Sequence, residues 1–344
     1  MHRLMQACYG AGPGDLAAVR ARLLRELCGL VPFDAAFFAT ADPDTLLFTS
    51  TYADGQLVEV ASQLLDNEFG VVADVNRFAA LASSADPTGS IDAATSGSRA
   101  ASARWNDILR PLGMGDEARA ALRVDGDTWG FVCLHRSGPL GFGPEELATV
   151  RRASPHIAEA LRRQVSGAGA EPTSSAANGI VILEATRIVA TGGDAARWLQ
   201  ELTGDHVSVG DPAPLTLLGV ARRLDALEAG VPGPPATIRV RSRTGSVVVM
   251  QATRLVGRDD SGGVAITLSP ATPVQRGSLL ASAYGLTPAQ RRVADLVLQG
   301  QTTRQIMQQL RISEYTVQDH LKAIFDKTGV RSRRDLVAAL LQQH

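Results

Sequence analysis

The segment from Leu286 to Leu341 carries helix start and stop signals at such short intervals that only short helices fit between them. Its start signals are Thr287 with Gln290, Thr302 with Gln305, Ser313, and Ser332 with Asp335. Such hydroxyl side chains bond the free backbone N–H groups of a first helical turn, and a Gln three residues later completes a capping box. Gly300 and Gly329 are positioned to end helices. The segment is therefore predicted to form four short helices.

The spacing between the second and third of these helices predicts helix-turn-helix geometry. Only Arg311, Ile312 and Ser313 separate them, so the helices must cross sharply and cannot form an antiparallel hairpin. Apolar residues recur at helical spacing and should form one compact core. These residues are Val293, Leu296, Val297, Ile306, Met307, Leu310, Val317, Leu321, Ile324 and Phe325.

Polar side chains lie opposite the apolar stripe of the third helix, where they could meet the major groove of DNA. Gln318, Asp319 and Lys322 are predicted to contact bases, since these residue types suit adenine, cytosine and guanine respectively. Hydroxyl and cationic groups near helix ends commonly hold phosphates. The predicted backbone contacts are Thr302, Thr303, Arg304, Tyr315, Thr316, Lys327, Arg331, Arg333 and Arg334. The net charge is +4 from Ala281 onward and −1 for the whole chain, which fits a polyanionic partner for this end.

The same segment resembles the LuxR-type helix-turn-helix family. The resemblance includes Leu-Thr-Pro at the start, the Gly300 break, and the pairs Thr316-Val317 and His320-Leu321. It implies that the third helix is the recognition helix and that the fourth often supports dimerisation on DNA. The chain departs from the usual family residues at Gln290 (Glu), Met307 (Ala) and Gln318 (Lys). Gln290 can still complete a capping box, whereas Gln318 removes a groove-facing cation and should shift base preference or weaken affinity.

The rest of the chain alternates helical and strand patterns and predicts an α+β multidomain protein that ends in an all-α four-helix domain. Residues 1–166 resemble a GAF sensor domain in their order of strands and helices, and residues 179–272 resemble a PAS domain. A Gly, Ala and Ser-rich linker at 167–178 separates them, and the helix-turn-helix domain is predicted at 280–344. A Ser, Ala and Gly-rich stretch at 83–97 is expected to be a loop.

One strand of the first unit carries candidate ligand-binding side chains. Trp129, Phe131, Cys133 and His135 alternate along it and are expected to share a face, which could line a ligand cavity or simply cover a helix. Cys133 and His135 could offer two ligands to a metal or haem, but a stable site needs more partners than the nearby sequence supplies. We therefore predict no metal site and no cofactor. Trp105 and Trp198 are expected to be core anchors.

The chain has no lysine before Lys322, which restricts the kinds of signal that its first two units could receive. Phosphate-accepting receiver domains and Walker-type nucleotide switches both use a lysine, so a sensor of a small ligand or a protein partner is expected instead. No catalytic residue pattern stands out, and we predict a protein that is not an enzyme. Three widely spaced cysteines, no secretion signal and no apolar stretch of membrane-spanning length favour a soluble, cytoplasmic protein.

The expected function is a sequence-specific DNA-binding transcription regulator. Its expected partners are double-stranded DNA, a second copy in a homodimer, a small-molecule effector of unknown identity, and RNA polymerase; no membrane is expected. Two alternatives stay open at this point. One is an interaction or scaffold protein whose tail only dimerises, and the other is an enzyme with a GAF-like pocket.

Overall fold

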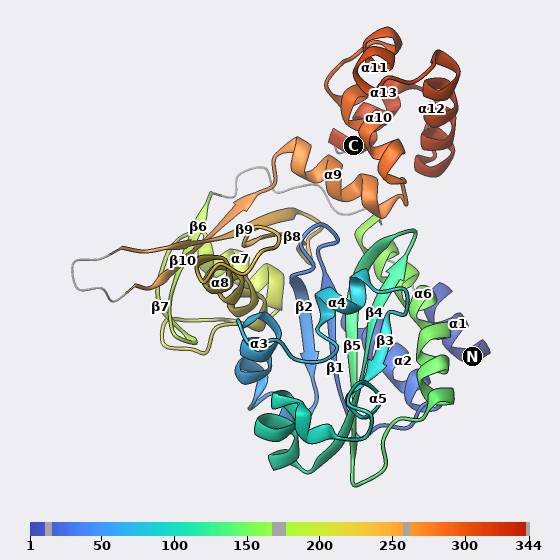
Figure 1. Cartoon of the computed structure of the whole chain (residues 1–344). Helices are drawn as coiled ribbons and strands as arrows, with labels where there is room; N and C mark the ends of the chain where they lie inside the picture. Colours follow the sequence, from blue (N-terminus) through green and yellow to red (C-terminus); the bar gives the residue numbers. More distant parts are fainter. Residues whose placement is uncertain (11–15, 167–176, 257–261, 342–344) are drawn as a thin grey trace.

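The computed structural model describes residues 1–10, 16–166, 177–256 and 262–341. It contains two five-stranded antiparallel sheets followed by a cluster of helices at the C-terminal end (Figure 1). This mixed architecture confirms the predicted fold class. The predicted linker, 167–178, lies outside the described residues except for its last two positions. Within the described part of the chain, no helix combines the length and apolar character that a bilayer crossing requires.

The first sheet has the strand order β2-β1-β5-β4-β3. Its strands are β1 (Ala35–Ala41), β2 (Phe48–Ala53), β3 (Thr88–Ser90), β4 (Met114–Val124) and β5 (Asp127–Ser137). The accompanying helices are α1 (His2–Tyr9), α2 (Leu16–Cys28), α3 (Ala61–Phe69), α4 (Phe78–Ser83), α5 (Ile91–Ala94) and α6 (Pro144–Ser166). Short helical turns lie at η1 (Gly55–Leu57), η2 (Arg99–Ala101), η3 (Trp105–Leu109) and η4 (Arg110–Leu112). Apolar residues of α1, α2 and α6 cover one face of this sheet.

The stretch 83–97 is not the loop that its composition predicted. It contains β3 and α5, and Ser90 begins α5 by accepting a hydrogen bond from the backbone N–H of Ala93. Ser90 is itself fully buried. Serine-rich composition favours loops because serine competes with the helix backbone, but the same hydroxyl stabilises a helix when it stands at the first position.

A bulge in the β4-β5 hairpin decides which side chains share a face. The register pairs Arg123 with Thr128 but Leu122 with Gly130, so Trp129 has no partner across the strand. Such an extra residue reverses the alternation of faces. Trp129 accordingly packs with the core under α1, α2 and α6, while Phe131 and Cys133 belong to the core on the opposite face. The expectation that Trp129 shares a face with Phe131 and Cys133 is therefore wrong.

The second sheet has the order β7-β6-β10-β9-β8, which is the same sequence of neighbours as in the first. Its strands are β6 (Gly179–Glu184), β7 (Arg187–Gly193), β8 (Thr237–Arg241), β9 (Val247–Arg254) and β10 (Val264–Pro270). Helices α7 (Ala195–Thr203) and α8 (Leu215–Glu228) accompany it. Trp198 of α7 is buried in its core, as expected for an anchor.

The two sheet units share one hydrophobic core. Phe48, Leu65 and Phe131 of the first unit lie in the same cluster of buried residues as Leu217 and Val248 of the second. Helix α8 is the main bridge, since it packs against both α3 and β2 as well as against β9 (Figure 1). The pair behaves as one packed body in this conformation, because a continuous apolar core resists separation.

A buried ion pair also links the units, and we call this cluster the Arg239 junction. Arg239 of β8 donates to Asp42 through its backbone N–H at 2.7 Å and through its guanidinium at 2.5 and 3.0 Å. The guanidinium also contacts Asp44 at 2.6 Å and donates to Ser278 Oγ at 3.1 Å. The junction therefore joins both sheet units to the helix that follows the second.

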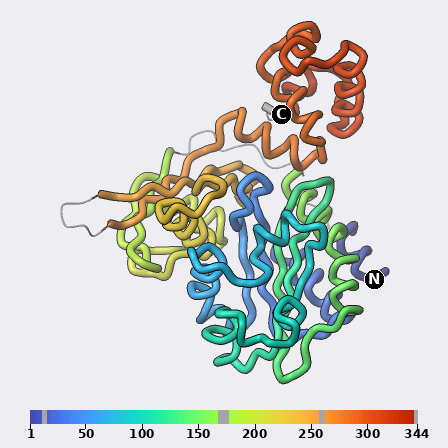
Figure 2. The backbone as a smooth tube through the Cα atoms, in the orientation of Figure 1, coloured from blue at the N-terminus to red at the C-terminus, as the bar shows by residue number. Residues whose placement is uncertain are grey.

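The C-terminal cluster contains one helix more than predicted. Helix α9 (Pro273–Ala283) precedes α10 (Pro288–Leu298), α11 (Thr303–Leu310), α12 (Glu314–Thr328) and α13 (Arg333–Leu341). Thr272 and Gln275 form a capping box at its start, the same signal that begins α10. The backbone trace in Figure 2 shows α9 running between the sheet units and the last four helices. It packs against α6 on one side and against α10 and α13 on the other.

Candidate nucleic-acid interface and buried polar cluster

The capping chemistry of the last four helices has the predicted form. Thr287 and Thr302 each accept from the backbone N–H of the Gln three residues later, whose side chain bonds back to the threonine N–H. Ser313 accepts from Thr316 N–H at 3.1 Å and begins α12. These side chains satisfy N–H groups that a helix cannot pair internally. They fix where each helix begins, and so they fix the orientation of α12.

The turn between α11 and α12 places Arg311 at a φ of 55°, in the left-handed region. Its backbone N–H bonds Met307 O and closes the end of α11. Val317, Leu321 and Ile324 of α12 are buried in the core of the cluster. Because this apolar face packs into the core, the opposite side of α12 points toward solvent.

We call that outward side the reading face, and it consists of Tyr315, Gln318, Asp319 and Lys322. All four side chains are exposed, Tyr315 by 77%, so the sheet units of the same chain do not cover them. Figure 1 shows α12 along the outer edge of the helix cluster. A protruding helix with free amide, carboxylate and ammonium groups has the form that enters a major groove.

The side chains expected at phosphates divide into two groups. Arg304, Arg331 and Arg334 are exposed. Lys327 is exposed as well, but it donates to Gly285 O at 2.7 Å and to Gln290 Oε1 at 3.0 Å. Arg333 donates to Gln301 O at 3.0 Å and to Thr303 Oγ1 at 2.9 Å. Lys327 and Arg333 therefore tie helices together, a role that sequence reasoning did not identify.

An ion pair connects the C-terminal helix cluster with the first sheet unit. Arg291 of α10 pairs with Asp127 at the tip of the β4-β5 hairpin. Within the first unit, neighbouring Asp125 accepts from Arg162 of α6 at 2.9 Å. Burial raises the pKa of Asp127, although the Arg291 guanidinium opposes the rise. A hairpin of the first unit thus contacts the first helix of the tail directly.

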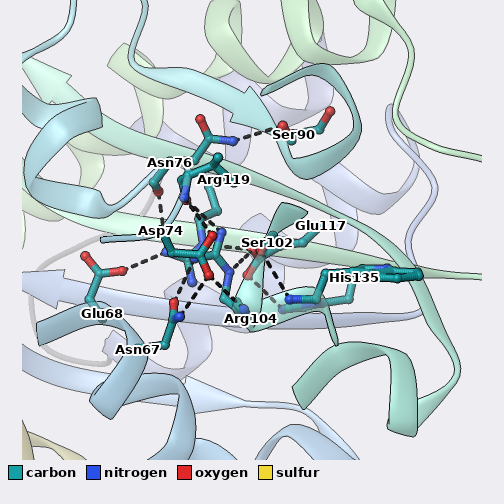
Figure 3. Close-up of polar contacts among 12 residues, drawn as sticks. Asn67, Glu68, Asp74, Asn76, Ser90, Ser102, Arg104, Glu117, Arg119 and His135 are labelled. Atoms are coloured by element: carbon teal, nitrogen blue, oxygen red, sulfur yellow. Dashed lines mark hydrogen bonds and ion pairs between the residues drawn. The ribbon is translucent and has the colours of Figure 1, made fainter. Parts of the chain in front are cut away.

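The first unit also contains a group of charged side chains that are removed from water, shown in Figure 3. We call Glu68, Arg104, Glu117 and Arg119 the buried polar cluster; each is at most 8% exposed. Arg104 donates to Glu117 Oε2 at 2.7 Å, and Arg119 donates to Glu68 Oε2 at 2.7 Å and contacts Glu117 Oε2 at 3.0 Å. The cluster contains two positive and two negative groups, so its formal charges cancel.

Polar groups of α3 and of the segment that follows it complete the surroundings of Arg104. Its guanidinium donates to Asn67 Oδ1 at 2.9 Å and to Val75 O at 3.0 Å, and its backbone N–H donates to Asp74 at 2.7 Å (Figure 3). Phe78 covers the Arg119 guanidinium at 4.5 Å from the ring centre. Buried charges are stable only when they are paired and hydrogen-bonded in this way. Sequence reasoning missed these residues, although the alternation of Glu117 and Arg119 on an apolar strand was a signal for paired charge.

A small cavity of about 20 Å³ adjoins the cluster. It is lined by Glu117, Cys133 and His135 and by apolar side chains that include Phe37, Phe48, Phe78 and, from the second unit, Leu215. Such a volume holds one or two water-sized groups. Burial would raise the pKa of Glu117, but Arg104 and Arg119 outweigh it and hold that pKa well below its usual range. Burial lowers the pKa of His135 to about 4 and raises that of the Cys133 thiol well above its usual value.

Comparison with known proteins agrees with the architecture of the tail. Residues 285–340 match the family model described as bacterial regulatory proteins, luxR family, and residues 15–161 match the GAF domain model. The spore germination protein GerE of Bacillus subtilis (strain 168) is 40% identical over 57 residues, which are 17% of this chain and 77% of that protein. The chain belongs to the luxR family of bacterial regulatory proteins. Membership makes this luxR-family chain a DNA-binding transcription regulator, and the GAF match confirms the predicted class of the first unit.

Solved structures give weaker similarities. A Vibrio cholera VqmA-ligand-DNA complex matches with a TM-score of 0.22 and 17% identity, over 49% of this luxR-family chain and 82% of that one. An E. coli DhaR(N)-DhaL complex matches with a TM-score of 0.26 and 12% identity, over 78% and 88% of the two chains. These TM-scores are too low to support an argument about fold or function. The PAS-like character of the second unit stays a prediction.

Proposed function

We propose that this regulator reads specific DNA sequences with α12 and that its two sheet units receive the signal. The observation that carries the proposal is the exposure of the reading face in the full chain. Gln318, Asp319 and Lys322 would contact base edges, and Tyr315 would lie beside the backbone. The groups have different donor and acceptor patterns, so they can distinguish base pairs and not merely bind charge.

Backbone contacts would come from the cations and hydroxyls around the reading face. Arg304, Arg331 and Arg334 are free to reach phosphates. Thr302 caps α11 and Thr316 lies in the first turn of α12, and backbone N–H groups at such helix starts favour anions. Lys327 and Arg333 contribute by holding the helices in register. Such contacts position the protein on duplex DNA and make its affinity strongly dependent on salt.

Signal transfer would pass through the contacts between the sheet units and the tail. The Arg239 junction connects both units with α9, and Asp127 contacts Arg291 of α10. A small effector or a protein partner that shifts the sheet units relative to one another would disturb both contacts. We also propose a homodimer on DNA with two recognition helices about one turn apart, acting on RNA polymerase in the cytoplasm.

We keep the domain limits 1–166, 179–272 and 280–344 as part of the proposal, with α9 as the connecting helix between the second unit and the tail. The shared core of the two sheet units implies that a stable truncation must retain both of them. A fragment that ends after the first unit would expose the apolar surface that now packs on α8.

The proposal is tested by selecting bound duplexes from a random pool with the full-length protein. Enrichment of a two-fold symmetric site, and an affinity that falls steeply with salt, are the expected results. Lys322→Ala should change the enriched sequence, whereas Arg304→Ala should weaken all sequences alike. Arg151→Ala removes the same charge from the exposed surface of α6 and serves as the matched control.

Absence of any enriched sequence, with binding that depends on salt alone, would reject sequence-specific reading. Absence of salt-sensitive binding to every duplex would favour the alternative in which the tail only mediates protein contacts. Equal effects of Lys322→Ala and Arg304→Ala on every sequence would reject the division into base and phosphate contacts.

A further inference from the structure

The β4-β5 hairpin adds a third side chain of metal-binding type to Cys133 and His135, which already lie two residues apart in the sequence. Glu117 lies directly opposite His135 in the antiparallel register, and Cys133 is two residues from His135 on the same face. One ligand atom from each residue lies within 4.8 Å of the others, and all three side chains are buried. The pair that seemed too small for a site in the sequence therefore acquires a third member across the strand.

Two members of this group have polar atoms with no hydrogen-bond partner among the described residues. These atoms are Glu117 Oε1 and both ring nitrogens of His135. Leaving such atoms unpaired in the core is unfavourable, because they have lost their hydrogen bonds to water. Arg104 and Arg119 occupy only the other oxygen of Glu117, so Oε1 is left facing the cavity beside His135 and Cys133. The arrangement has the character of a site prepared for a bound group.

The size of the cavity and the donor set together select that group. About 20 Å³ accommodates an ion with a water but no organic molecule. One imidazole, one thiol and one carboxylate suit a borderline metal such as Zn²⁺, whereas Mg²⁺ and Ca²⁺ take oxygen ligands. Glu117 Oε1 and His135 Nε2 are 3.8 Å apart, close to the roughly 3.4 Å between two ligands of a tetrahedral zinc ion.

We propose that Glu117, Cys133 and His135 bind one divalent transition-metal ion of the zinc class, with a fourth position open to the cavity. Binding converts the Cys133 thiol to a thiolate and releases its proton to solvent. Burial raises the pKa of Cys133 and disfavours the thiolate, and the charge of Arg119, which lies opposite Cys133 in the register, partly offsets this. The fourth position would hold water or another small ligand, because Phe37, Phe48 and Phe78 leave no room for more.

The test uses the untagged full-length protein, freed of metal by a chelator and titrated with Co²⁺ as a spectroscopic probe. We expect one equivalent to bind, with a thiolate-to-cobalt charge-transfer band that Zn²⁺ abolishes. Cys133→Ser should remove the band and weaken Co²⁺ binding at least about tenfold. Cys28→Ser is the matched control, since Cys28 lies on α2 outside the cavity and should bind as the wild type does.

Failure of the wild type to bind one equivalent, or a band that survives in Cys133→Ser, would overturn the proposal and leave the unpaired atoms to a buried water. X-ray absorption of the zinc-loaded wild type provides a measurement that needs no variant. One sulfur with nitrogen and oxygen neighbours supports the site, and a shell without sulfur overturns it. Both readouts are independent of DNA binding, so failure here leaves the proposed regulatory function untouched.

Discussion

The reading face of α12 and the buried polar cluster use charged side chains in opposite environments. Asp319 and Lys322 are exposed, and their side chains form no hydrogen bond or ion pair with the described residues. Arg104 and Glu117, in contrast, are buried and paired with each other. Charges in water contribute little to folding and are free to recognise a partner. Charges in the core are costly unless every partner is present. The comparison predicts that substitutions in the first region alter recognition and that substitutions in the second alter stability.

The largest effect is expected from Arg104→Met. The change removes the three hydrogen bonds of the Arg104 guanidinium and leaves Glu117 buried with Arg119 as its remaining cationic partner. The bond from the Arg104 backbone N–H to Asp74 survives. We expect the free energy of unfolding to fall by about 3–5 kcal/mol. Urea unfolding followed by tryptophan fluorescence measures it, and a loss below about 1 kcal/mol would show that water compensates the cluster.

The contrast between these regions also explains what could be predicted from the sequence. Helices α10 to α13 begin and end at local signals such as Thr287 and Gly329, and those signals act within one turn of the chain. The same reasoning could have found α9, since Thr272-Pro273 with Gln275 repeats the pattern of α10. The exposed side of α12 followed from helical periodicity alone.

The buried polar cluster and the candidate metal ligands could not be predicted in this way, because they depend on register. A regular hairpin around Asp125-Gly126 would place Glu117 opposite Leu134, on the face away from Cys133. The bulge at Trp129 shifts the pairing by one residue and puts Glu117 opposite His135. Composition does not reveal a one-residue bulge, and a slip of one residue exchanges the two faces. Arg104 is further still from these residues in sequence and reaches them only through tertiary packing.

The second prediction concerns Arg239→Met, which tests whether a charge between two units behaves like one within a unit. Asp42 is 1% exposed and would lose its guanidinium partner. It would keep the backbone N–H groups of Arg239 and Asp44, which donate to it at 2.7 and 3.1 Å. We therefore expect a smaller loss than for Arg104, about 2–3 kcal/mol.

Arg239→Met should also weaken the link from the sheet units to α9, because the bond to Ser278 is lost. Hydrogen exchange of α9 measures that link directly, and faster exchange is the expected result. Ser278→Ala is the matched control, since it removes the bond to α9 while the pair with Asp42 stays intact. Unchanged exchange in both variants would show that packing alone holds α9.

The third prediction takes the comparison to the reading face. Lys322→Ala should leave the unfolding free energy within about 0.5 kcal/mol of the wild type, since its side chain is exposed. It should weaken binding to the preferred duplex by about 1–3 kcal/mol, if Lys322 contacts a base. Titration with labelled duplexes that differ at one base pair measures the effect. A stability loss as large as that of Arg104→Met would break the comparison.

The smallest effect is expected for the exposed pair of Arg151 and Asp86, whose side chains are 53% and 48% exposed at a separation of 2.8 Å. Arg151→Ala should lower the free energy of unfolding by at most about 1 kcal/mol, because water screens the pair.

The same pair predicts a pH dependence, because the pKa of Asp86 is lowered. Partial burial opposes the shift, but the hydroxyl and N–H of Thr88 and the charge of Arg151 outweigh it. An acid whose pKa is lowered by folding stabilises the protein above its unfolded pKa, near 4, and loses that contribution as the pH falls through the folded value. Since both Thr88 bonds persist in Arg151→Ala, we expect most of the pH dependence to remain there and to disappear in Asp86→Asn. Unfolding free energies at several pH values between about 2 and 5 separate the two contributions. If Arg151→Ala abolished the pH dependence, an exposed ion pair would contribute as much to the free energy of unfolding as we expect only of a buried pair.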